Sequence, residues 1–188
     1  AGAFSVSNDS DLKWVYFLDG LKDGDNNIAA LIRCNDMLRQ TFADSEHYQN
    51  YSVIMKNELI FRKSGMVVGD KFFYDNYCTY QNTDFETWRK QSFESNTWQL
   101  FPLEEIDTGE RTFQAMTFSY PVRNYIQQEP EANAVVQFLL SKENLEQMFG
   151  QLLSRQGGIL IYDAEDRLLA SLGKINADGD DPENTDLF

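Results

Sequence analysis

The chain has 188 residues, enough for one well-packed domain or for one domain and part of another, and 42% of them are hydrophobic. Its formal net charge of −14 argues against nucleic-acid binding, which needs a basic face, and against binding to an anionic membrane surface. The sequence contains no apolar run of about 18 residues, the length that a membrane-spanning helix requires.

The first residues, AGAFSVSNDSD, lack the basic start and the long apolar run of a signal peptide. We therefore expect the chain to be a mature or excised part of a longer protein. The two cysteines, Cys34 and Cys78, have no metal-binding spacing. They are either two buried thiols or a disulfide, and a disulfide would imply an oxidising compartment.

The first half of the chain predicts helices on either side of a β-hairpin. A first helix is expected from Asp11, and residues 27–43 carry apolar side chains at the spacing of an amphipathic helix. The segments ELIFRKS and MVVGDKF, separated by Ser64-Gly65, predict a hairpin. A short helix is expected to begin near Asp84.

The second half predicts three extended segments, a helix and another hairpin. The segments are NTWQLFPLEEI, with an edge or bend at Pro102, then RTFQAMTFSYPV and EANAVVQFLLS. In RTFQAMTFSYPV, Thr117 falls on one face of the strand and Tyr120 on the other. A helix in KENLEQMFGQLLS is expected to end at Gly157, before the hairpin GGILIYDAEDRLLASLG. This order predicts an α+β fold with an antiparallel sheet.

Signatures of catalysis and metal binding are weak. We interpret the single histidine, His47, as a surface residue, because nothing in the sequence places a nucleophile beside it. Residues 23–27 and 178–184 are acidic but do not fit the EF-hand calcium loop, so we interpret them as a solvated turn and a flexible tail. We expect a non-catalytic protein without a cofactor or a bound metal, although the many carboxylates leave a glycosidase-type pair as an alternative.

Aromatic and polar side chains gather in the middle of the chain. Tyr and Trp combine an apolar ring with a polar tip, which suits a small-molecule pocket, although ordinary core and surface packing would use the same residues. The cluster comprises Tyr74, Tyr77, Tyr80, Trp88, Arg89, Trp98 and Tyr120.

The succession of ELIFRKSGMVVGDKFFYDNY, DFETWRKQSF, WQLFPLEEI, TFQAMTFSYPV and NAVVQFLLSKENLEQMF, closed by GGILIYDAEDRLLASLG, resembles a known family. It is similar to the extracytoplasmic double-Cache (PAS-like) sensor domains of bacterial membrane receptors. It is most similar to those of AraC-type transcriptional regulators and sensor histidine kinases of Firmicutes. The resemblance runs from about Asn27 to Gly173.

The resemblance implies a long N-terminal helix packed on an antiparallel PAS-like (Cache) sheet, followed by the first hairpin of a second, truncated module. Residues 1–26 would form an N-terminal segment and the start of the helix, and residues 27–156 the membrane-distal module. Residues 157–173 would open the membrane-proximal module, and residues 174–188 would be a flexible tail. The domain would lie outside the cell and be joined to the membrane through flanking helices.

The family's distal module holds its ligand beside the sheet, between strands and short helices. By position, the resemblance implies ligand-binding roles for Tyr77, Trp88, Arg89, Trp98, Thr117 and Tyr120. Known amino-acid-binding Cache domains join a closely spaced Tyr, Arg and Trp to a later Tyr and Asp. Trp88-Arg89 does not reproduce that order, so the ligand class stays open.

The expected partner is an unidentified small molecule or an extracytoplasmic protein, and a second copy of the chain would give a homodimer. Two other functions remain as alternatives. One is a secreted, carboxylate-dependent hydrolase or an accessory domain of one, and the other is a protein–protein interaction domain without a small ligand.

Overall fold

The computed structural model describes residues 25–43, 50–94, 97–122, 132 and 134–174. The helix expected from Asp11, His47 and the acidic segment 178–184 lie outside these residues. None of the described helices is long and apolar enough to cross a membrane.

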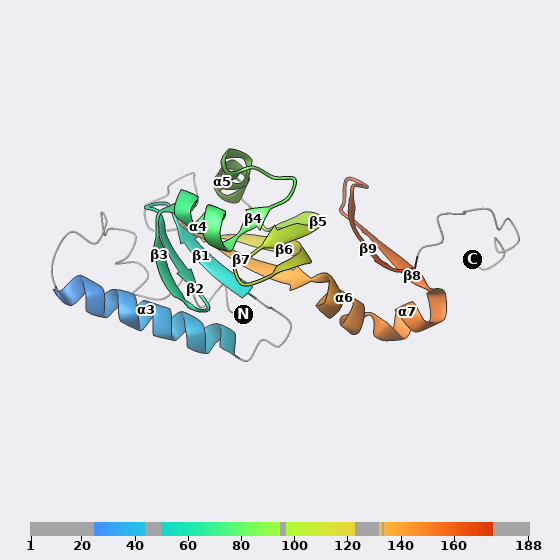
Figure 1. The fold of residues 1–188 in the computed structure, drawn as a ribbon, viewed down its shortest axis with the longest axis horizontal. Coiled ribbons are helices and arrows are strands. Elements are labelled where there is room, and N and C mark those ends of the chain that lie inside the picture. The colour runs from blue at the N-terminus through green and yellow to red at the C-terminus, as the bar shows by residue number, and fades with distance from the viewer. Residues whose placement is uncertain (1–24, 44–49, 95–96, 123–131, 133, 175–188) are drawn as a thin grey trace, which may run out of the picture.

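One antiparallel sheet of seven strands forms the body of the protein, in the order β3-β2-β1-β7-β6-β5-β4 (Figure 1). The strands are β1 (Asn50–Met55), β2 (Leu59–Arg62), β3 (Gly65–Val68), β4 (Thr79–Tyr80), β5 (Gln99–Asp107), β6 (Thr112–Val122) and β7 (Ala134–Ser141). Strand β7 pairs with both β1 and β6, so the last strand of the sheet lies at its centre. The expected α+β architecture, a long helix packed on an antiparallel PAS-like sheet, is confirmed.

Helices cover both faces of this sheet, because side chains along each strand alternate between two cores. Helix α3 (Asp25–Ala43) packs on one face through Leu31 and Leu38. Helices α4 (Asp70–Tyr77) and α5 (Phe85–Glu94) cover the opposite face (Figure 1). Cys34 and Cys78 are buried thiols in these two opposite cores, so they do not form a disulfide with each other.

The structure corrects the expected elements at three points. Strands β1 and β4 are additional strands, and a turn at residues 56–58 separates β1 from β2. The expected strand MVVGDKF ends at Val68, since Gly69, with φ of 95°, turns the chain into α4. The helix expected in KENLEQMFGQLLS is divided at Phe149 into α6 (Lys142–Met148) and α7 (Gly150–Gln156).

The C-terminal hairpin is confirmed and forms a separate two-stranded sheet from β8 (Gly158–Tyr162) and β9 (Leu168–Gly173). Gly157, with φ of 78°, ends α7 as expected. Strand β9 lies against β5, and a third core joins the hairpin to the sheet and to α6. The buried members of this core are Met116, Leu145, Leu169, Ala170 and Leu172.

Candidate functional site

A row of polar side chains crosses the sheet on the face covered by α5. In register across β2, β1, β7, β6 and β5, the row is Arg62, Ser52, Gln137, Ser119 and Gln99. Its centre is deeply buried, since Gln137 and Ser119 are each only 3% exposed. Burying polar side chains costs free energy unless they find hydrogen-bond partners, which makes this row a candidate binding surface.

Helix α5 closes over the row with Trp88 and Ser92. Gln137 Nε2 donates to Ser92 Oγ at 3.0 Å, and Ser92 Oγ donates to the Trp88 carbonyl at 2.7 Å. Two of the buried polar atoms that lack a hydrogen-bond partner among the described residues lie at this contact, Trp88 Nε1 and Gln137 Oε1. The indole is a donor and the amide oxygen an acceptor, so the contact between α5 and the sheet holds one unused group of each kind.

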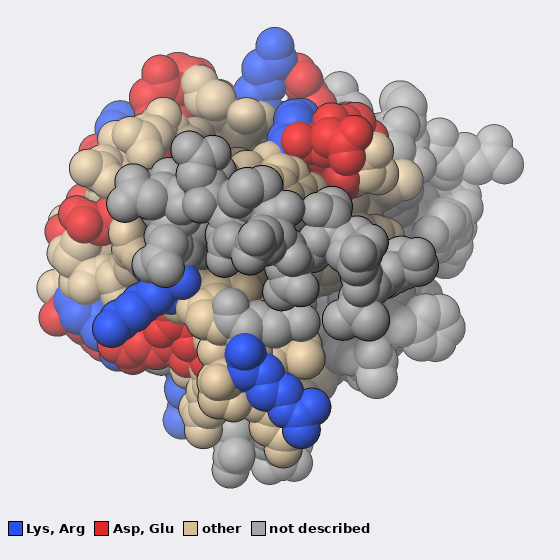
Figure 2. Space-filling view, turned by 90° about the vertical axis from the view of Figure 1, so that its right-hand side faces the viewer, with Lys and Arg blue, Asp and Glu red and all other residues tan. Residues whose placement is uncertain are grey.

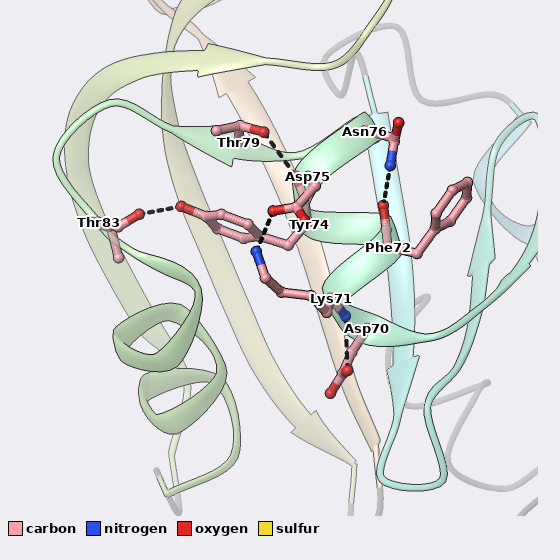
Figure 3. A network of polar contacts seen from close by, with 8 residues as sticks. All are labelled: Asp70, Lys71, Phe72, Tyr74, Asp75, Asn76, Thr79 and Thr83. Atoms are coloured by element: carbon pink, nitrogen blue, oxygen red, sulfur yellow. Dashed lines mark hydrogen bonds and ion pairs between the residues drawn. The ribbon is translucent and has the colours of Figure 1, made fainter.

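Two contacts between α4 and the α5 region hold Trp88 over the sheet. Arg89 Nε lies 2.5 Å from Asp70 Oδ2 and so joins the start of α4 to α5. The Tyr74 hydroxyl donates to the Thr83 carbonyl just before α5, as Figure 3 shows. Helix α5 itself begins as expected near Asp84, whose carboxylate accepts from Thr87 N at 2.8 Å.

A second buried hydrogen bond lies beside Trp88, between the Tyr80 hydroxyl and Thr117 Oγ1 at 2.9 Å. Burial raises the pKa of Tyr80 well above its ordinary value, and the neighbouring Cys78 thiol acts in the same direction. Tyr80 is therefore a neutral phenol at physiological pH, able to donate or to accept a hydrogen bond.

The space left between these side chains is about 10 Å³, which is roughly the room that one water needs. A larger ligand would therefore have to displace at least one of them. The cavity is lined by Tyr80, Thr83, Trp88, Gln91, Phe101 and Glu104.

We predict that Thr117→Val lowers the free energy of unfolding by about 1–2 kcal/mol, because it removes a partner of the buried Tyr80 hydroxyl without changing the side-chain shape. Urea unfolding followed by circular dichroism would measure the change. The matched control is Thr112→Val, an exposed threonine on the same strand, which should change the stability by less than about 0.5 kcal/mol. Equal effects of the two variants would contradict the prediction.

The predicted site residues do not all lie together. Trp88 lines the cavity beneath α5, and Thr117 is hydrogen-bonded to Tyr80, which also lines it, while Arg89 is held in its ion pair with Asp70. Tyr77 belongs to the same core, but its ring carries the Arg62 guanidinium, 3.9 Å from the ring centre.

Tyr120 and Trp98 lie elsewhere. Tyr120 packs against the α3 core, on the face of β6 opposite to Thr117, so these two cannot line one pocket. Trp98 is 58% exposed, and its ring stacks on Phe118 with 6.1 Å between centroids. Gln137 and Ser92 were not predicted as site residues. A glutamine in the middle of the apolar strand AVVQFLLS does indicate a buried polar side chain.

A larger cleft of about 760 Å³ opens at the edge of β5, between that edge and the tip of the hairpin. It is lined by residues 97–102 and 161–165 together with Gln91, Arg167 and Leu169. Gln91 and Phe101 line both the cleft and the buried cavity, so these two side chains separate the hollows.

The charges of the described surface do not indicate a polyanionic partner. Figure 2 shows the side of the molecule that carries the hairpin, where Asp and Glu are interspersed with a few Lys and Arg. Within the part of the chain that the structure describes, no group of three or more His, Cys, Asp or Glu is placed to hold a metal ion.

No protein-family model matches the chain, and no curated protein matches it. Among solved structures, it is similar to the periplasmic sensory domain of the Campylobacter jejuni chemoreceptor Tlp1, with 9% sequence identity and a TM-score of 0.47. The match covers 90% of this chain and 63% of the other, so the chain spans less than two thirds of that domain. A superposition this loose assigns no family, and the function has to be argued from the site itself.

Proposed function

We propose that the chain is the extracytoplasmic ligand-sensing domain of a transmembrane signalling protein, either a transcriptional regulator or a histidine kinase, and that it is not an enzyme. The observation that carries the proposal is the buried pair of unused groups beneath α5, Trp88 Nε1 and Gln137 Oε1. Such groups are costly in an ordinary core, whereas a ligand bound beneath α5 would offer an acceptor to the indole N–H of Trp88, which lines the cavity, and a donor to the nearby Gln137 amide, which is hydrogen-bonded to Ser92 of the same helix.

A ligand in this pocket would also change the contact between the sheet and the C-terminal hairpin. Phe101 borders the pocket and lies where the pairing of β5 with β6 shifts register, between Phe101 and Glu104. Strand β5 packs in turn against β9 of the hairpin. Under this proposal, a ligand that displaces Phe101 shifts the contact between the membrane-distal module, residues 27–156, and the start of the membrane-proximal module, residues 157–173.

One observation favours a second candidate function. The cavity of about 10 Å³ is too small for an organic ligand as the side chains stand. A protein–protein interaction domain would need no larger space, because its partner would bind to the outer surface.

The test is thermal unfolding of the purified chain against a panel of amino acids, carboxylates, polyamines and sugars. A ligand that binds only the folded protein adds about 2.7 kcal/mol of stability at about one hundred times its Kd, which raises the Tm by a few degrees. We expect a saturable shift for one class and its loss in Trp88→Phe, which keeps an aromatic ring but removes the indole N–H.

For the amino acids, carboxylates and polyamines of the panel, Trp98→Phe is the matched control, because this tryptophan lies outside the pocket and its replacement should leave the shift unchanged. A panel without any shift would contradict small-molecule sensing and favour the protein-partner function. A shift that survives Trp88→Phe would show that the ligand binds elsewhere.

A further inference from the structure

The cleft between β5 and the hairpin has the dimensions of a binding site and is not used by the proposed pocket. Its volume of about 760 Å³ lies in the usual range for small-ligand sites. Its walls come from segments far apart in the sequence, residues 97–102 on the sheet side and residues 161–165 in the hairpin. An occupant would therefore contact both the sheet and the hairpin.

Both walls present exposed aromatic rings. Trp98 is 58% exposed and Tyr162 is 51% exposed, and both line the cleft. Stacking on Phe118, with an angle of 21° between the ring planes, supports one side of Trp98 and orients it. Large aromatic side chains left exposed in a hollow are typical of ligand sites, where they offer flat apolar surfaces.

The polar groups of the cleft suit an uncharged partner with hydroxyl groups. Gln91 and Gln99 both line it, and Gln99 Oε1 is a buried acceptor that has no hydrogen-bond partner among the residues described. Each amide can both donate and accept, as neighbouring hydroxyl groups require.

The charged groups at the hairpin tip already satisfy one another. Arg167 Nε lies 2.6 Å from Asp163 Oδ2, and Arg167 Nη2 lies 3.4 Å from Glu165 Oε2. A charged ligand would need an unpaired protein group of opposite charge in the cleft. The net charge of −14 also makes binding of an anion unfavourable.

The edge of β5 is poorly suited to an added peptide strand. Pro102 has no N–H to donate, and the register shift between Phe101 and Glu104 interrupts a regular ladder. These features favour a small molecule over an extended peptide.

We propose that this cleft binds a neutral saccharide. The apolar faces of its sugar rings would lie on Trp98 and Tyr162, and its hydroxyl groups would bond to Gln91 and Gln99. Gln91 and Phe101 line both this site and the pocket beneath α5 and separate the two.

Isothermal titration of the whole chain with three neutral trisaccharides, maltotriose, cellotriose and triacetylchitotriose, tests the proposal. We expect at least one to bind. Trp98→Ala should weaken that binding by about tenfold or more, whereas Trp98→Tyr should retain most of it. Because Trp98 is more than half exposed, these variants should fold normally.

Trp88→Phe distinguishes the cleft from the pocket beneath α5. If the cleft is the site, this variant binds the trisaccharide as the wild type does. Loss of binding in Trp88→Phe with normal binding in Trp98→Ala would overturn the cleft proposal and place the sugar in the pocket. Absence of binding by all three trisaccharides would also overturn it, without bearing on the pocket's response to other ligand classes.

Discussion

Replacing Gly109 with alanine is expected to lower the free energy of unfolding by about 3 kcal/mol or more. Gly109 has φ of 75°, a conformation that costs an L-residue about 1–2 kcal/mol. A Cβ at this position would also lie 2.3 Å from the carbonyl oxygen of Asn76. Because that oxygen belongs to the backbone of α4, it cannot rotate away, and the loop between β5 and β6 would have to lift off the helix.

The lifted loop would carry Glu110 with it, whose carboxylate lies 3.8 Å from Arg62 Nη2. We therefore expect the substitution to break this contact between the loop and strand β2 as well. Urea unfolding followed by circular dichroism measures the loss.

Gly150→Ala is the control for this comparison. A Cβ at Gly150 would meet nothing within 4 Å, and the residue lies in α7. Alanine is the better helix former by about 1 kcal/mol, so this variant should be unchanged or slightly more stable. A loss of stability in Gly150→Ala as large as that in Gly109→Ala would contradict the explanation given for Gly109.

The second large effect is expected at alkaline pH. Burial raises the pKa of the Cys78 thiol from 9.0 to about 12, although a hydrogen bond with Tyr80 opposes this rise. Burial also raises the pKa of Tyr80 well above its ordinary value. Both groups are thus held in their neutral forms in the folded protein, while the unfolded chain releases their protons more easily.

Because the pKa values of both Cys78 and Tyr80 are raised in the folded protein, the stability should fall as the pH rises. A group whose pKa is higher in the folded state contributes its full stability below the unfolded pKa and loses it as the pH rises toward the folded one. For Cys78 the loss should begin above pH 9 and continue toward pH 12, at no more than about 1.4 kcal/mol for each pH unit.

Unfolding free energies measured by urea titration between pH 7 and about pH 11 would test this. In Cys78→Ala the decline above pH 9 should become shallower, and the remainder should reflect Tyr80 and other titrating groups. An unchanged slope in Cys78→Ala would show that the buried thiol does not govern the alkaline transition.

Much of the fold could be predicted from the sequence, because it depends on local patterns. The apolar spacing of residues 27–43 predicts α3, and the alternation in RTFQAMTFSYPV predicts the two faces of β6. Single residues with special backbone preferences also act locally, as Pro102 does at the bulge of β5 and Gly157 at the end of α7. The expected strand MVVGDKF holds only as far as Val68, because Gly69 turns the chain into a helix.

The candidate site depended on the tertiary structure. Alternation along β6 separates Thr117 from Tyr120, but it does not say which of them faces α5. That choice follows from the pairing of β6 with β5 and β7, which also brings Gln137 and Ser119 into one row. Trp98 and the hairpin meet only because β9 packs against β5.

The sequence by itself determined the α+β class, most of the helices and strands, and the strongly acidic net charge, since propensity and periodicity are properties of short stretches and charge is a sum over residues. The tertiary structure alone decided that Trp88 lines a buried cavity, that Thr117 and Gln137 are linked to it through hydrogen bonds with Tyr80 and Ser92, and that Trp98 lines a different cleft. The physical reason is strand register: pairing between distant segments decides which side chains meet, and shifting it by one residue would move each of them to the opposite face of the sheet.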